Sequence, residues 1–196
     1  MAKMMGPRFK KCRSLGLNVV GHPKAMDRLK SDSSRDSKKL SDYGLQLLEK
    51  QRLRAYYGVM DKQFTRYVDK AFRKGSNPGP RILVALEKRF DNMVYRMGFA
   101  RSIRQARQMV NHGHFLVNGK KVDRPSYEIH VGDIITLREK SQGLTIIANN
   151  LAEVANTLPY VEVDKDKLQG TLIREPLRDE LPIEINEQLI VEYYAR

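Results

Sequence analysis

The chain has 196 residues, of which 41% are hydrophobic and 30% are charged, and its formal net charge is +13. This length accommodates one large domain or two small ones, and the longest aliphatic runs, such as residues 82–86 and 144–148, are far shorter than the roughly 20 residues that cross a bilayer. No membrane span and no secretory signal are expected, which predicts a cytoplasmic protein. The single cysteine, Cys12, excludes an intramolecular disulfide and a zinc cluster built from cysteines.

The positive charge is concentrated in the first two-thirds of the chain. Residues 1–124 contain 29 basic and 10 acidic residues, a net charge of +19, whereas residues 125–196 contain 7 and 13, a net charge of −6. A basic surface indicates a polyanionic partner. The acidic C-terminal segment would be repelled by phosphate, so it is predicted to pack on the protein itself or to meet a basic protein neighbour.

The N-terminal half is predicted to be helical after an irregular start. Residues 1–40 combine Gly, Pro and a Ser/Asp/Lys-rich run with scattered apolar residues, which predicts an irregular basic arm. Ser41 suits the N-cap of a first helix that stops at Gly58. A second helix is predicted over residues 61–73, and a third begins at Arg81.

The remaining chain mixes helices and strands. Ser102 and Gln105 fit a capping box and Gly113 fits a C′ position, so a helix is predicted over residues 103–112. Asn118-Gly119 predicts a type I′ hairpin turn. The other predicted elements are a short helix over residues 90–98, a strand at 134–137, a helix at about 144–158, strands at 160–163 and 171–173, and a helix from Asn186.

The stretch from Arg101 to Val122 is the strongest candidate for a binding site. Arg104, Arg107, Gln108 and Asn111 fall on one stripe of the predicted helix. No carboxylate occurs between Arg101 and Lys121, so these cations are expected to have no local salt-bridge partners. Such a stripe can be an ordinary solvated helix face, but its single sign of charge, continued by Lys120 and Lys121 beside the turn, predicts an anion-binding clamp.

Two histidines in this stretch could suggest a metal or a catalytic site. His112 and His114 have no neighbouring acid or thiol, whereas zinc requires three or four ligands. No nucleophile, phosphate-binding loop or metalloprotease motif accompanies them. They are therefore predicted to stack on bases or to bond phosphates, with packing at the helix end as the alternative.

A second basic concentration lies in the predicted arm, where Arg8, Lys10, Lys11 and Arg13 surround Phe9. It is either a disordered tail or an arm that becomes ordered on nucleic acid.

Residues 90–102 and 113–122 resemble the S-four RNA-binding module, which is named after a protein of the bacterial small ribosomal subunit and presents a basic groove to structured RNA. The Gly6-Pro7 start, residues 43–54 and residues 185–194 also resemble the ribosomal S-four family, so the resemblance covers nearly the whole chain. The module alone is less specific, because it also occurs in pseudouridine synthases, tyrosyl-tRNA synthetases and small stress proteins.

The resemblance implies a non-enzymatic constituent of the small ribosomal subunit that binds the 5′ region of its RNA early in assembly. It also implies contact with ribosomal protein S-five, other small-subunit proteins and messenger RNA, with consequences for translational accuracy. The RNA-binding residues that the resemblance implies are Arg8, Lys10, Lys11, Arg13, Arg101, Ser102, Arg104, Gln105, Arg107, His112, His114, Asn118, Gly119, Lys120 and Lys121. From the basic residues that line the predicted helices between them, Arg54 and Arg66 are added as further candidates. Many family members bind zinc through four cysteines in the arm; this chain has only Cys12, so no metal and no cofactor are expected.

Together these observations predict an α+β protein. Its predicted parts are the arm over residues 1–40, a helical RNA-binding domain over 41–90, the S-four module with a short twisted antiparallel sheet over 91–155, and C-terminal strands and a helix over 156–196 that pack back on the helical domain. Two rivals stay open: an RNA-modifying enzyme with an appended module, and a stress-type RNA binder that acts outside the small subunit.

Overall fold

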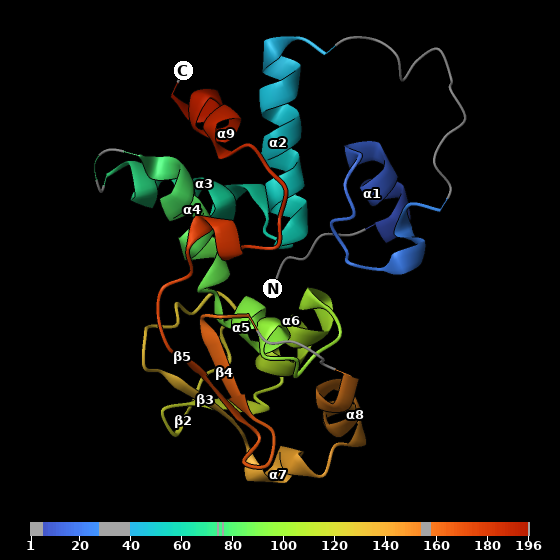
Figure 1. The fold of residues 1–196 in the computed structure, drawn as a ribbon, viewed down its shortest axis with the longest axis vertical. Coiled ribbons are helices and arrows are strands. Elements are labelled where there is room, and N and C mark those ends of the chain that lie inside the picture. Colours follow the sequence, from blue (N-terminus) through green and yellow to red (C-terminus); the bar gives the residue numbers. More distant parts are fainter. Residues whose placement is uncertain (1–5, 28–39, 74, 76, 154–157, 196) are drawn as a thin grey trace. The chain divides into compact units, whose positions relative to one another are not determined.

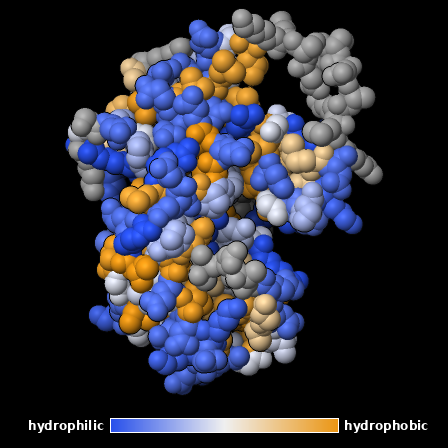
Figure 2. Space-filling view, in the orientation of Figure 1, coloured by the Kyte–Doolittle hydropathy of each residue, from blue (hydrophilic) through white to orange (hydrophobic). Residues whose placement is uncertain are grey.

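The computed structural model describes residues 6–27, 40–73, 75, 77–153 and 158–195. It divides into two compact units, one formed by residues 1–82 and 183–196 and the other by residues 83–182. The division falls within helix α4 (Pro78–Glu87) (Figure 1). On the face that Figure 2 shows, the surface of each unit is mostly hydrophilic, and apolar residues are visible among the hydrophilic ones.

The first unit is helical. It contains α1 (Arg8–Leu15), the 3-10 turn η1 (Pro23–Ala25), α2 (Asp42–Tyr56), α3 (Asp61–Phe72), the start of α4 and the C-terminal helix α9 (Glu187–Tyr194). The Ser41 hydroxyl accepts a hydrogen bond from Gly44 N, which confirms the predicted N-cap of α2. Its largest fully buried side chains are Leu53, Tyr57, Phe64 and Ile82.

The prediction of an irregular arm over residues 1–40 was wrong for residues 8–15, which form α1. Cys12, Leu15, Val19 and Ala25 are buried together, and side chains of α2 pack against them. The apolar residues that looked scattered in sequence therefore share one small core, and burying them stabilises the helix. The Ser/Asp/Lys-rich part of the predicted arm lies mostly outside the described residues.

The second unit contains a five-stranded antiparallel sheet in the order β2-β1-β3-β5-β4. Its strands are β1 (Phe115–Val117), β2 (Lys120–Lys121), β3 (Ile134–Leu137), β4 (Val161–Asp164) and β5 (Gln169–Leu172). Alternate residues of the central strands are buried on one face, as the two-residue period of a strand requires. On that face the ring of Phe115 packs edge-on against Phe90 and Phe99.

The helices of this unit are α5 (Phe90–Arg96), α6 (Ile103–Asn111), α7 (Glu139–Gln142) and α8 (Thr145–Glu153), and a second 3-10 turn, η2, covers Arg178–Glu180. The end of the predicted helix at 144–158 falls partly outside the described residues. Helix α4 begins three residues before the predicted start at Arg81, because proline is tolerated in the first turn of a helix.

One prediction about the C-terminal segment was wrong. Strands β4 and β5 were expected to pack with the helical domain, but Ile134, Ile135 and Thr136 of β3 pair with β5. The strands lie in the second unit, and only residues 183–196 return to the first. Pairing with β5 gives hydrogen-bond partners to the backbone N–H and C=O groups on the edge of β3 that β1 leaves open. Nothing in the local sequence of β3 indicates which strand supplies these partners. In the described part of the chain, no helix is long and apolar enough to span a membrane.

Candidate nucleic-acid interface

Helix α6 separates a buried face from a polar one. Ser102 Oγ accepts a hydrogen bond from Gln105 N, as the cap predicted, and Gln105 Oε1 accepts one from Arg101 N at 2.8 Å. Ala106, Met109 and Val110 are buried. Arg104, Gln108 and Asn111 are exposed on the other side, so the predicted stripe exists as a surface.

Arg107, however, is held by a buried acid. Its Nε and Nη2 lie 2.7 and 2.6 Å from Oδ2 of Asp91, which is fully buried in α5. Asp91 also accepts hydrogen bonds from Nε and Nη2 of Arg89 at 3.0 and 2.9 Å. A side chain with this geometry fixes α6 against α5, because two of the three guanidinium nitrogens point at the same carboxylate. Arg107 thus holds α6, and with it the exposed polar stripe, in place against α5.

Arg101 also has an acidic partner, Glu153 of α8, although both side chains are more than half exposed. The expectation that the cations of this stretch have no local salt-bridge partners holds, since both acids are distant in sequence, but Arg101 and Arg107 each have a partner from elsewhere in the chain. The two acids come from outside the acid-free stretch, which is why its sequence did not reveal them. An exposed pair of this kind contributes little to stability and can exchange its carboxylate for a phosphate.

The Asn-Gly turn is built as the sequence predicted. Asn118 and Gly119 have φ angles of 50° and 76°, which the type I′ turn requires. The amide of Asn118 is used internally: Nδ2 donates to Asp133 Oδ1 at 2.7 Å, and Oδ1 accepts from Ile134 N at 2.9 Å. Asn118 therefore fastens the hairpin to the start of β3, while Gly119 is exposed at its tip.

The hairpin carries its two lysines next to the end of α6. Lys120 and Lys121 are both exposed on β2. A Cβ at Gly113 would lie only 2.5 Å from Cε of Lys121, so the stem of this lysine passes directly over the glycine that ends α6. Because Gly113 has no side chain, Lys121 can pass this close, and its ammonium group lies at the same part of the surface as the end of α6.

The two histidines differ in environment. Their ring centroids are 6.0 Å apart, and His112 is exposed, whereas His114 is half-buried with Nδ1 2.9 Å from Oγ of Ser141. Burial of the ring, and to a smaller extent the neighbouring His112, lowers the pKa of His114. His114 is thus neutral near pH 7 and supports the packing of β1 on α7, while His112 faces the solvent beside Lys121.

The basic residues of the first unit are described separately. On α1, Arg8 and Lys10 are exposed and Lys11 and Arg13 are half-buried. Arg66 of α3 is exposed. Arg54 Nη1 lies 3.1 Å from Asp61 and donates to Gln51, and only 14% of its side chain is exposed.

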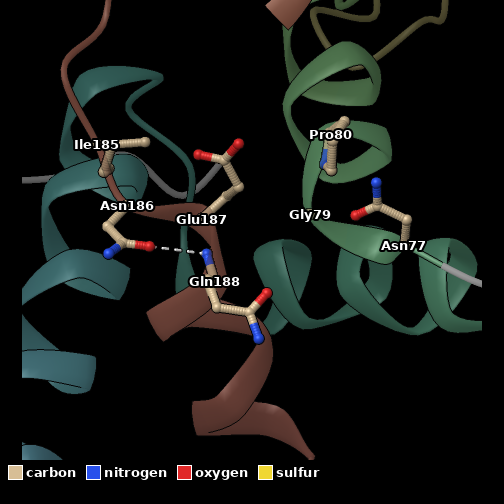
Figure 3. A pocket seen from close by; sticks show the side chains of 7 residues that line it. All are labelled: Asn77, Gly79, Pro80, Ile185, Asn186, Glu187 and Gln188. Atoms are coloured by element: carbon tan, nitrogen blue, oxygen red, sulfur yellow. Dashed lines mark hydrogen bonds between the residues drawn. The ribbon is translucent and has the colours of Figure 1, made fainter.

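A pocket in the first unit lies where α4 and α9 begin, and it is lined by Asn77, Gly79, Pro80 and residues 185–188 (Figure 3). Asn186 Oδ1 caps α9 by accepting from Gln188 N at 3.1 Å. A Cβ at Gly79 would lie 2.8 Å from Cγ of Glu187, so the glycine permits the close approach of the two helices. The one charged side chain of the lining, Glu187, is acidic and would repel phosphate.

Within the described ranges, no group of three or more His, Cys, Asp or Glu side chains could hold a metal ion. Cys12 is fully buried in the core of residues 12–25. Its thiol donates a weak hydrogen bond to Asn18 Oδ1 at 4.0 Å, and the residue otherwise behaves as a small apolar one. The absence of zinc stays a prediction.

Sequence reasoning missed three residues that orient the site: Asp91, Ser141 and Glu153. Asp91 had a usable signal, since it is the one acid in a segment with Phe90, Met93 and Val94, and a buried acid requires a cationic partner. Ser141 and Glu153 lie 27 and 52 residues from their partners, and nothing in their local sequence indicates the contact.

Comparisons with known proteins cover the whole chain. The model of the S4 domain matches residues 88–135, and that of the ribosomal protein S4/S9 N-terminal domain matches residues 3–87. The chain is 52% identical to small ribosomal subunit protein uS4 of Finegoldia magna and 46% identical to uS4B of Clostridium acetobutylicum. It is 47% identical to uS4 of Macrococcus caseolyticus, and each of these three alignments spans 100% of both chains.

Proposed function

The chain belongs to the uS4 family of small ribosomal subunit proteins, and from this premise we infer that it is a structural constituent of the small ribosomal subunit that binds ribosomal RNA. The observation that carries this inference is the similarity over the full length of both chains, since the module alone also occurs in other RNA-binding proteins. The family relation supports a structural, non-enzymatic role.

We propose that the RNA lies across the exposed end of α6 and the hairpin. This surface combines Arg104, Gln108 and Asn111 with His112 and the two lysines of β2, all of them exposed. Cationic and amide donors bind phosphates and 2′-hydroxyls, which are the groups that structured RNA presents in its accessible groove. Ser102, Gln105, Arg107, His114 and Asn118 make internal contacts and shape this surface, and Arg101 contributes when phosphate replaces Glu153.

We propose that the cations of the first unit form a second contact with the RNA. Four of these cations lie on helix α1: Arg8, Lys10, Lys11 and Arg13. Arg66 is an exposed cation of α3. Phosphate contacts from both units would supply affinity and a steep dependence on salt, because each neutralised phosphate releases a condensed counterion.

The finer expectations are proposals as well. They are binding to a helical junction in the 5′ region of the RNA early in assembly, contact of the acidic C-terminal segment with ribosomal protein S-five, contact with messenger RNA, and residence in the cytoplasmic ribosome. The acidic side chains of Glu187 and Glu192 on α9 suit a basic protein partner better than RNA.

Competition binding tests the proposed function. The purified protein is bound to a transcript of the 5′ domain of small-subunit ribosomal RNA against a scrambled RNA of equal length, over about 50–200 mM salt. Preference for the transcript that persists at the higher salt is expected. Equal binding that fades as salt rises would refute specific recognition, and sedimentation of the protein with the large subunit would favour the stress-type alternative.

The rival enzyme is tested with the same protein. An RNA-modifying enzyme would turn over bulk RNA, and we expect no modified nucleoside above the level of a control incubation without protein. Stoichiometric or greater product would overturn the non-enzymatic assignment.

A further inference from the structure

The C-terminal end of the cationic helix α1 is bound by an arginine of α2. Arg52 Nε donates to Leu15 O at 2.7 Å. Leu15 is the last residue of α1, where carbonyl groups lack helical partners and the helix dipole is negative, so a guanidinium is favoured there. A Cβ at Gly16 would lie 3.2 Å from Nη2 of Arg52, which shows how closely the backbone passes the guanidinium.

A buried carboxylate fixes this arginine. Glu49, one turn earlier on α2, accepts from Arg52 Nη1 at 2.6 Å through Oε1. Its other oxygen, Oε2, accepts from the backbone N of Asn186, the N-cap of α9, at 3.0 Å. Only 9% of the Glu49 side chain is exposed. One carboxylate therefore joins the arginine that holds α1 to the start of the C-terminal helix.

Helices α1 and α2 also share an apolar contact. Leu48, Ala55 and Tyr56 of α2 pack against the small core around Cys12 and Leu15. Apolar burial sets which face of α1 meets α2, but it is not directional and leaves the exact rotation of the helix loosely specified. The planar guanidinium of Arg52, donating to a carbonyl in one direction and to a carboxylate in another, does specify it.

We propose that Arg52, oriented by Glu49, is a positioning residue for the RNA contacts of α1. Three-quarters of its side chain is buried and two of its nitrogens bind within the protein, so it acts through the exposed cations Arg8 and Lys10. The inference rests on the proposed function, in which α1 contacts RNA.

A double-mutant cycle on the full-length chain tests it. One change is Arg52→Lys, which keeps the charge but cannot donate in two fixed directions. The other neutralises the exposed cations of α1, as Arg8→Gln with Lys10→Gln. Affinity for the 5′-domain transcript and the slope of its salt dependence are measured for each variant and for their combination. Urea unfolding and amide exchange in α2 verify that every variant is folded.

Neutralising Arg8 and Lys10 removes two phosphate contacts, so the slope of log affinity against log salt concentration should fall by about two. Arg52→Lys should lower the same slope by a part of that amount, although no charge is lost. When Arg8 and Lys10 are already neutral, Arg52→Lys should have a clearly smaller effect than in the unchanged chain, limited to what it transmits to Lys11 and Arg13. Arg54→Lys is the matched control, since Arg54 is a half-buried arginine of the same helix that pairs with Asp61; its effect should add to that of the α1 changes.

The outcomes separate the two proposals. Additive effects of Arg52→Lys and the α1 changes would overturn the positioning role alone. An unchanged affinity and slope in the variant with neutral α1 would overturn the RNA role of α1, and the positioning role with it. Amide exchange gives an independent reading, because Arg52→Lys should accelerate exchange in α1 before it affects α3; equal protection in α1 would also count against the inference.

Discussion

Asp91 should be essential for the stability of the second unit, whereas the exposed cations above it should matter for binding. Its carboxylate is fully buried and accepts two hydrogen bonds from Arg89, two from Arg107 and one from Asn92 N. Removing one member of a buried ion pair costs about 3–5 kcal/mol, because the remaining charge loses its compensation. Against a total stability of about 5–15 kcal/mol, Asp91→Ala should remove about a fifth or more.

Arg107→Ala should cost less, about 1.5–3 kcal/mol, because Asp91 keeps its two bonds to Arg89. Arg104→Ala, on the exposed side of the same helix, should change stability by no more than about 0.5 kcal/mol. Urea unfolding gives the midpoints, and Asp91→Ala should lower the midpoint of the second unit by more than about 1 M. Since the two units can unfold separately, amide exchange in α6 assigns the loss to the correct unit.

RNA affinity should follow the opposite order. Arg104→Ala should weaken binding to the 5′-domain transcript by about 1–3 kcal/mol, as expected for one lost charge-assisted contact. Folded Arg107→Ala should bind nearly as well as the unchanged protein. If Arg107→Ala unfolds at the same urea concentration as the unchanged chain and binds as poorly as Arg104→Ala, Arg107 is a direct phosphate contact and the reasoning fails.

Four further outcomes are expected. Replacing Lys120 and Lys121 together by Gln should lower the slope of the salt dependence by about 1–2 with little loss of stability; an unchanged slope would remove the hairpin from the interface. Because the pKa of His114 is lowered from its ordinary value of 6.5, the unfolded chain binds more protons, so stability should fall as pH drops below about 6.5, and His114→Gln should flatten that dependence in urea unfolding. Cys12→Ser should cost about 1–3 kcal/mol by placing a hydroxyl in an apolar core, and elemental analysis of the purified protein should find no stoichiometric zinc.

Much of the fold follows from local signals. The caps at Ser41, Ser102 and Asn186 and the Asn118-Gly119 turn all formed where their residue types predict, because each satisfies backbone groups within a few residues of itself. Helix α1 was missed because its apolar residues are few and its stability comes from packing against α2. The association of β5 with β3 was missed for a similar reason, since the two strands are more than 30 residues apart in the chain.

The candidate site shows the same limit in electrostatic form. An acid-free interval of sequence excludes local partners for its cations but not distant ones: Arg107 meets an acid 16 residues away and Arg101 one 52 residues away. Burial distinguishes the two cases. The contact to fully buried Asp91 is a permanent part of the fold, because breaking it strands a charge in the interior, whereas the exposed contact to Glu153 can be exchanged for RNA at little cost. A basic stripe in a sequence therefore predicts where a polyanion binds, but only the burial of each cation's partner shows which cations are available to bind it.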